Sequence, residues 1–222
     1  MPDIALQVLL EDNHLLAVAK PAGMLSMGDD TGDESVADLA KQYLKRKYNK
    51  PGNVFLGVVH RLDRPVSGVL VFARTSKAAS RLSDQFRRGA VSKRYVAVVE
   101  GHVRESAGLL TDWLHKDREK NHVSVVAKAV QDARECRLEY QVLSHDDSST
   151  TVGLRPLTGR SHQIRVQLAN QGHPIVGDLR YGADDPLGHR ILLHAQQLEF
   201  EHPTQKTPVI VEAPTPADFR SS

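Results

Sequence analysis

A polar loop between two apolar runs, at residues 58–68, limits the folds that are open to this chain. Two valines lead into the cluster His60-Arg61-Leu62-Asp63-Arg64, and the apolar run 69–73 follows it. Short apolar runs that end at turn residues predict buried strands. The polar cluster is therefore predicted to lie on a loop that two core strands hold in place.

Asp63 is the carboxylate of this loop, and His60, Arg61 and Arg64 place positive charge around it. The proline after Arg64 disfavours helical geometry there, and Gly68 tolerates backbone conformations that other residues avoid. Loops on a rigid scaffold often carry catalytic groups. Asp63 is thus a candidate catalytic residue, although a turn aspartate in an ordinary salt bridge has the same local pattern.

The composition bounds the class of protein. The chain has 222 residues, a formal net charge of +2 and one cysteine. Lysine and arginine crowd residues 41–50, 60–64, 74–94 and 155–165, so a local basic face can bind a polyanion despite the small net charge. Cys136 alone can form neither an intrachain disulfide nor a thiolate metal site, and its alternating neighbours predict a core-facing strand residue.

Targeting and cofactor signals are missing from the sequence. Its N-terminus lacks the positively charged residues and the long apolar stretch of a secretory signal peptide. No apolar run approaches membrane-spanning length. Its 11 histidines follow no recognised ligand spacing, and the phosphate loop, dinucleotide fingerprint, zincin helix and nucleophile elbow are absent. We expect a cytoplasmic protein with no membrane contact, no metal and no cofactor.

Apolar periodicity predicts three helices, and shorter apolar runs predict strands. The first helix covers residues 36–44. Either Thr31-x-x-Glu34 or Ser35-x-x-Asp38 can form the capping box at its N-terminus. The second begins after Thr75 or Ser76 and ends near residue 88. Strands are expected at residues 5–10, 15–19, 69–73, 93–99, twice within 121–142, and at 175–179, 191–193 and 198–200. This mixture predicts one α+β domain.

The third helix is predicted to run from a Ser161 cap to Gly172, with a proline just beyond. Arg160 and His162 then lie at its positive end, and Arg165 is one turn further on. A helix N-terminus with adjacent cations favours a phosphate or carboxylate. Surface residues with an ordinary cap are the competing interpretation of this stretch by itself.

Three separated motifs resemble, in order and spacing, those of the RluA-type pseudouridine synthases. They are His60-Arg61-Leu62-Asp63-Arg64-x-x-Ser67-Gly68, Lys93-x-Tyr95, and Gly159-Arg160-x-His162-Gln163-Ile164-Arg165. The segments 11–23 and 172–178 are also similar to that family. The likeness spans nearly the whole chain, from about Val8 to Pro214.

This resemblance implies a cofactor-independent isomerase that converts uridine in RNA to pseudouridine. It implies an α+β fold with a long, mixed and mainly antiparallel sheet, flanked by helices, with the active cleft across the sheet. Asp63 would be the catalytic carboxylate, Tyr95 would pack on the target base, and Arg165 would pair with the aspartate. The motif residues expected to bind RNA are His60, Arg61, Arg64, Lys93, Arg160, His162 and Ile164.

The sequence departs from the family pattern at two places. Val66 stands where many relatives have threonine, and Gln167 stands where many have histidine. The chain also begins with the catalytic segment, so we expect a single catalytic domain over residues 1–222 without a separate N-terminal RNA-binding module. We further expect a monomer whose partner is ribosomal or transfer RNA.

Two other functions compete with this prediction. An inactive RNA-binding or ribosome-assembly factor could keep the fold, but it would be expected to lose Asp63 first. A carboxylate-based nucleoside or glycoside hydrolase usually needs two acids. The three motifs contain no second one.

Overall fold

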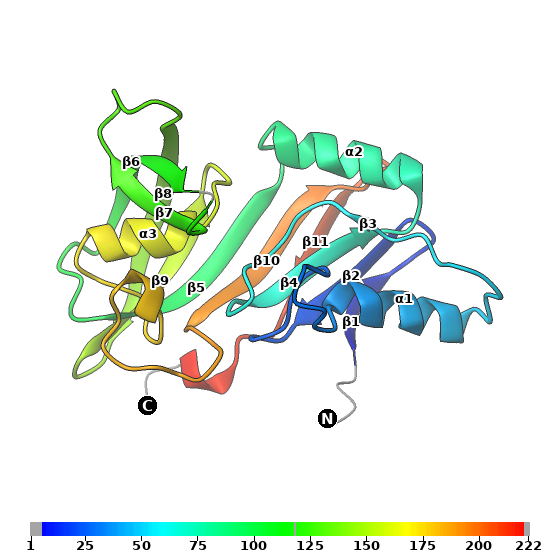
Figure 1. Ribbon diagram of the computed structural model, residues 1–222, viewed down its shortest axis with the longest axis horizontal. Coiled ribbons are helices and arrows are strands. Elements are labelled where there is room, and N and C mark those ends of the chain that lie inside the picture. Colours follow the sequence, from blue (N-terminus) through cyan, green and yellow to red (C-terminus); the bar gives the residue numbers. More distant parts are fainter. Residues whose placement is uncertain (1–5, 118, 220–222) are drawn as a thin grey trace. The chain divides into compact units, whose positions relative to one another are not determined.

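The computed structural model describes residues 6–117 and 119–219 (Figure 1). The chain divides into two compact units, each built from two segments. The first unit comprises residues 1–91 and 195–214, and the second comprises residues 92–194 and 215–222. No helix within the described ranges is long and apolar enough to cross a membrane. That the whole chain works as one catalytic domain stays a prediction.

The first unit contains a mainly antiparallel sheet. In sheet order its strands are β1 (Gln7–Glu11), β2 (Leu15–Lys20), β4 (Ser67–Ala73) and β10 (Leu193–Glu201). The short strand β3 (Gly57–Val58) pairs with β4, and β11 (Pro208–Glu212) pairs with β10. The strands predicted at residues 5–10 and 15–19 are confirmed as β1 and β2, which pair antiparallel, although Ala5 lies outside the described residues.

Strands β2 and β4 are buried on both faces, because a helix covers each side of them. Helix α1 (Val36–Lys47) shares one apolar cluster with Leu16 and Phe72, while helix α2 (Ser76–Arg87) shares another with Leu15 and Val71. Neighbouring strand residues point to opposite faces. A strand covered twice therefore reads as a continuous apolar run, which is the pattern that residues 69–73 show.

The two helices of the first unit begin at caps that their local sequence encodes. The Ser35 hydroxyl accepts a hydrogen bond from the backbone N–H of Asp38, whose carboxylate accepts one from the Ser35 N–H in return. This is the second of the two predicted capping boxes. Thr75 caps α2 by accepting from the N–H of Ala78. Each cap supplies a partner for an N–H that the helix itself leaves unpaired.

The second unit contains an antiparallel sheet with the strand order β5-β9-β8-β6-β7. These strands are β5 (Ser92–Glu100), β6 (Ala107–Asp117), β7 (His122–Val126), β8 (Arg134–His145) and β9 (Ser149–Pro156). Helix α3 (Gln163–Asn170) packs on β6, β7 and β8. Its Val166 joins a core cluster with Cys136, which is fully buried as predicted.

The structure corrects two expectations in this unit. Helix α3 is shorter than predicted, because His162 and not Ser161 is its N-cap, with φ of 51° and no side-chain cap. Residues 175–179 form no strand: Ile175 makes one isolated bridge to Val99, and a 3₁₀ turn covers Leu179–Tyr181. A second 3₁₀ turn covers Ala217–Phe219. The predicted C-terminal Gly172 is confirmed, with φ of 82° just beyond the helix.

Candidate functional site

The loop that carries Asp63 joins β3 to β4, as predicted, and its shape is fixed from the segment after β2. The buried Ser26 hydroxyl donates to the carbonyl of Leu62 at 2.7 Å and accepts from the Leu62 N–H at 3.1 Å. On the other side, the Asp63 carbonyl accepts from the N–H of Val66 at 3.0 Å. Asp63 thus lies between a pinned residue and a tight turn.

The Arg64 backbone is held as firmly as that of Leu62. Its carbonyl accepts from the Gly23 N–H at 2.8 Å and from the Lys20 ammonium at 3.0 Å. Its guanidinium donates to the Gly23 carbonyl and pairs with Asp33 at 2.8 Å. The residues on both sides of Asp63 are therefore clamped by residues 20–26, which limits the positions that the carboxylate can reach.

Lys20 is the most deeply buried cation of this segment, at 1% exposure. Its Nζ also donates to the carbonyls of Pro21 and Met24, so three carbonyl oxygens surround it. Burial lowers the pKa of Lys20 to about 7, while the negative charge of Asp63 acts in the opposite direction. Only the ammonium form has three N–H donors for these three carbonyls.

Gly68 ends the loop at a position that excludes any side chain. Its φ is +122°, and a Cβ there would collide with the backbone of Ala195. Both features require glycine, the first because L residues avoid this conformation and the second because two strands approach closely. The loop can therefore enter β4 only with glycine at this position.

The side chain of His60 contacts other residues of the first unit. Its Nε2 accepts from the Val71 N–H at 2.9 Å, and its ring stacks on Phe86 with centroids 4.6 Å apart. This contact ties the loop to both β4 and α2. Arg61, next to it, is exposed. RNA contacts by His60, Arg61 and Arg64 stay predictions.

In the second unit, Lys93 and Tyr95 lie two residues apart on β5 and so share one face of the sheet. Tyr95 lies opposite Leu154 of β9. The Lys93 ammonium donates to the Thr158 carbonyl at 3.4 Å, beside the turn that leads to α3. Burial lowers the pKa of Lys93. The second and third motifs are thus neighbours in space.

Arg165 forms a buried ion pair with Asp178, a partner that the motifs did not indicate. Its Nε and Nη2 donate to the two carboxylate oxygens of Asp178 at 2.6 and 2.7 Å. The side chains are 6% and 2% exposed. The Arg165 guanidinium also lies over the ring of Tyr181, 5.0 Å from its centroid. This arrangement fixes the plane of the guanidinium.

Tyr181 joins this pair to His162. Its hydroxyl accepts from the Val123 N–H at 3.2 Å and lies 2.7 Å from His162 Nδ1. Burial raises the pKa of Tyr181, which favours the neutral phenol.

The other residues of the third motif take part in local structure. Arg160 Nε donates to the Glu135 carbonyl at 3.2 Å, and Ile164 is buried at 7% exposure. The buried amide of Gln163 accepts from Thr158 and Arg160 and donates to the Arg137 carbonyl. These bonds shape the turn before α3. RNA binding by Lys93, Arg160, His162 and Ile164 stays a prediction.

The structure therefore gathers the predicted residues into two groups, one in each unit. His60, Arg61, Asp63 and Arg64 share one loop, and the remaining six, Lys93, Tyr95, Arg160, His162, Ile164 and Arg165, lie along β5 and at the start of α3. Motif reasoning missed Lys20, Ser26, Asp178 and Tyr181. The family-like segments 11–23 and 172–178 were a signal for Lys20 and Asp178. Nothing local indicated the other two.

Within residues 6–117 and 119–219, no group of three or more His, Cys, Asp or Glu side chains could hold a metal ion. The charged groups of the two motif regions are instead arranged in ion pairs and hydrogen bonds to carbonyls. Within each unit, such an arrangement holds charged groups in fixed positions, which suits electrostatic stabilisation of a bound substrate.

Comparison with known proteins supplies the family. A family model described as RNA pseudouridylate synthase matches residues 14–170. The Dual-specificity RNA pseudouridine synthase RluA of Escherichia coli K12 is 35% identical over 222 residues, covering 96% of this chain and 94% of the relative. The Ribosomal large subunit pseudouridine synthase C of Buchnera aphidicola is 33% identical over 223 residues, covering 97% and 69%.

Solved structures agree with the sequence relatives. The human RNA Pseudouridylate Synthase Domain Containing 4 superposes with a TM-score of 0.79 at 26% identity, covering 96% of this chain and 90% of that one. The human RNA Pseudouridylate Synthase Domain Containing 1 superposes with a TM-score of 0.75 at 29% identity, covering 95% of this chain and 83% of that one. The predicted α+β pseudouridine synthase fold is confirmed. The chain belongs to the RNA pseudouridylate synthase family as an RluA-type member, a family of isomerases that modify RNA.

Proposed function

We propose that this chain isomerises a specific uridine of structured ribosomal or transfer RNA to pseudouridine. The names of its relatives support an RNA substrate, since one specifies the large ribosomal subunit and others specify dual specificity. The observation that carries the proposal is the clamped loop, in which Ser26 and Lys20 fix the residues on both sides of Asp63. A carboxylate held in this way is preorganised for chemistry.

The reaction rearranges one nucleotide without a net gain or loss of atoms. The bond between ribose C1′ and uracil N1 breaks, the base turns, and C5 bonds to C1′. The proton at C5 is then removed, and N1 ends as N–H. We propose that Asp63 acts as the catalytic carboxylate at the sugar, because an ionised carboxylate can attack C1′ or stabilise positive charge there.

Tyr95 and Arg165 have complementary proposed roles. The Tyr95 phenol can pack on the target uracil and take up the C5 proton, because a phenol can stack, donate and accept. The Arg165 guanidinium can hold negative charge at the reacting centre, and Asp178 and Tyr181 fix its orientation. Asp178 already occupies Nε and Nη2 of Arg165, so any further carboxylate must use the remaining N–H groups.

The target base must leave its stack before these residues can act on it. Extruding a base costs about a few kcal/mol, and contacts with flanking nucleotides must offset this cost. We propose that His60, Arg61, Arg64, Lys93, Arg160, His162 and Ile164 contribute such contacts. That the protein works as a cytoplasmic monomer also stays a prediction.

Asp63→Asn tests the catalytic role. Pseudouridine would be mapped across the RNA of a deletion strain of the source organism, complemented with wild type or with the variant. We expect wild type to restore at least one site. The variant should make product at least about 10³-fold more slowly in vitro, since an amide cannot replace the carboxylate at C1′.

The matched control is Asp30→Asn, the same substitution at an exposed position of the same unit. It should behave as wild type, and RNA affinity should be nearly equal in all three proteins. An Asp63→Asn variant that makes pseudouridine at the wild-type rate would show that the assignment is wrong. If wild type binds RNA but restores no site, the chain is a binding or assembly factor.

A further inference from the structure

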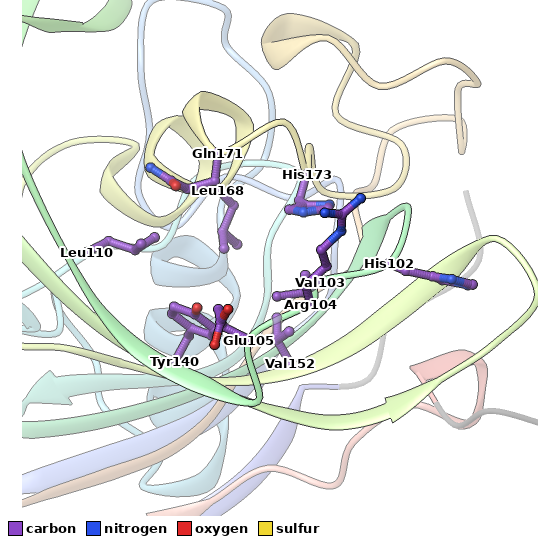
Figure 2. A pocket seen from close by; sticks show the side chains of 10 residues that line it. All are labelled: His102, Val103, Arg104, Glu105, Leu110, Tyr140, Val152, Leu168, Gln171 and His173. Carbon is purple, nitrogen blue, oxygen red and sulfur yellow. The ribbon is translucent and has the colours of Figure 1, made fainter.

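The second unit contains a cavity of about 450 Å³ that the proposed roles leave unused (Figure 2). Its lining comes from the segment after β5, from β6, β8 and β9, and from the C-terminal end of α3 and the residues beyond. The volume lies within the range of small-molecule sites, about 300–1,000 Å³. A cavity of this size can take one nucleobase with part of its sugar.

Part of the cavity wall is apolar. Figure 2 shows Leu168 of α3 facing Tyr140 and Val152 of the sheet, with Leu110 and Val103 at the sides. Flat apolar and aromatic walls suit a planar ligand, because base rings gain most of their binding energy from stacking.

A glycine makes room for the aromatic wall. Gly108 lies opposite Tyr140 in the sheet, and a Cβ at this position would come within 2.7 Å of the phenol ring. The ring therefore rests on the backbone of β6 instead of on a side chain. This close approach holds Tyr140 in a fixed orientation along one wall of the cavity.

Polar groups converge on the same cavity. Arg104, Glu105 and Gln171 line it together with Tyr140, and in the described part of the chain their side chains make no hydrogen bond or ion pair with other groups. These side chains therefore offer donors and acceptors to a ligand. His102 and His173, at the same opening, already bind the carbonyls of Asp146 and Glu100.

The cavity lies on the face of the sheet that carries Tyr95 of the second motif. Tyr95 lies opposite Leu154, and Leu154 lies opposite Tyr140, so the three side chains form one row across β5, β9 and β8. Directly opposite residues point to the same face. Tyr95 and Tyr140 lie on strands separated by β9, so two inter-strand spacings, about 10 Å, lie between their backbones. One RNA strand can reach both.

We propose that this cavity is a subsite for an unpaired nucleobase of the RNA substrate, a few nucleotides from the target uridine. The proposal rests on the proposed function and extends it to recognition. Glu105 can only accept hydrogen bonds when ionised, so it favours a base with an amino group, as adenine, guanine and cytosine have. The same carboxylate disfavours a phosphate inside the cavity, whereas Arg104 can hold the phosphate of the captured nucleotide.

Leu110→Trp tests the proposal by filling the cavity. Leu109→Trp is the matched control, since it introduces the same side chain one residue away on the opposite face, where Leu109 is 54% exposed. We expect the first variant to raise KM for the RNA about tenfold, with a much smaller effect on kcat, as the loss of one stacked base would. The control should match wild type. Circular dichroism and thermal melting would verify that both variants fold.

Cross-linking provides a second readout that needs neither cavity variant nor turnover. RNA with 6-thioguanosine, a photoreactive nucleoside that keeps an exocyclic amino group, at single positions would be bound to Asp63→Asn, irradiated and digested, and the cross-linked peptides would be identified by mass spectrometry. We expect one position to cross-link to Tyr140 or Val103. Replacing the base captured here by uracil should weaken binding in wild type and less so in Glu105→Gln.

The outcomes separate this proposal from the function itself. If wild type makes pseudouridine but Leu110→Trp and Leu109→Trp have equal KM values, the subsite proposal is wrong and the enzyme assignment stands. Cross-links confined to peptides outside the cavity would also overturn it. If wild type makes no pseudouridine, a cross-link at Tyr140 would still support base capture.

Discussion

At the scale of single residues, the buried ion pair between Arg165 and Asp178 is the main feature of the second unit. Arg165 and Asp178 are almost completely buried, and each would be costly to bury without the other. Tyr181 covers the guanidinium and binds His162, so one ion pair organises the start of α3. This frame fixes the orientation of the guanidinium, which the proposed electrostatic role of Arg165 requires.

Asp178→Asn should separate the structural and catalytic consequences of this pair. The amide keeps the shape but removes the charge that compensates Arg165, so we expect a loss of about 3 kcal/mol in the free energy of unfolding. Urea denaturation would measure it, with the exposed Asp185→Asn as control. Equal stability of the two variants would contradict the importance of the pair. Product formation should also slow at saturating RNA, because the guanidinium loses its fixed plane.

At the scale of elements, one carboxylate joins three parts of the first unit. Glu11, at the end of β1, accepts from Lys47, Tyr43 and Tyr48 at the C-terminal end of α1 and from Arg74 after β4. Burial disfavours the ionised carboxylate, but the hydrogen bonds from α1 outweigh this and lower the pKa of Glu11 to about 2. The helix that follows the loop at residues 26–33 is thereby anchored to the sheet.

This shifted pKa predicts a pH dependence of stability. A carboxyl whose pKa is lower in the folded than in the unfolded protein stabilises fully above its unfolded pKa, near 4.5, and loses the effect as the pH falls toward 2. Glu11→Gln should therefore cost about 2 kcal/mol at pH 7 and progressively less below pH 5. Denaturation at several pH values would measure the difference, with Glu199→Gln, at an exposed position of β10, as control. A difference that is constant down to pH 2 would contradict this explanation.

At the scale of the whole molecule, neither unit is continuous in sequence. The core between the sheet and α2 includes Leu198, Phe200 and Val211, which follow residues 92–194 of the second unit along the chain. The first 91 residues therefore lack part of their own core.

A fragment of residues 1–91 should consequently remain largely unfolded. We expect it to show no cooperative thermal transition by circular dichroism, whereas the full chain shows one, because β10 and β11 supply one side of its apolar cluster. Adding a peptide of residues 195–214 should increase the ordered structure. A fragment that folds cooperatively without the peptide would show that β10 and β11 are dispensable for this core.

The sequence by itself determined the features that depend on neighbouring residues. The buried run of β4 and the interior position of Cys136 follow from patterns within a few residues. The same kind of pattern offered two caps for each of the first two helices, and the structure selects Ser35 and Thr75. The family motifs likewise indicated Asp63, Tyr95 and Arg165, although their catalytic roles remain proposals. The Ser161 cap was wrong, because His162 takes the left-handed conformation and bonds to Tyr181 instead.

Only the tertiary structure decided which distant groups meet. The ammonium of Lys20 reaches the Arg64 carbonyl across 44 residues, and Asp178 reaches Arg165 from a segment that forms no regular strand. The cavity beside Tyr140 combines several separate segments. The physical reason is that periodicity and capping act within a turn or a strand. Ion pairs and cavities instead depend on how completed elements pack, and chain order does not specify this.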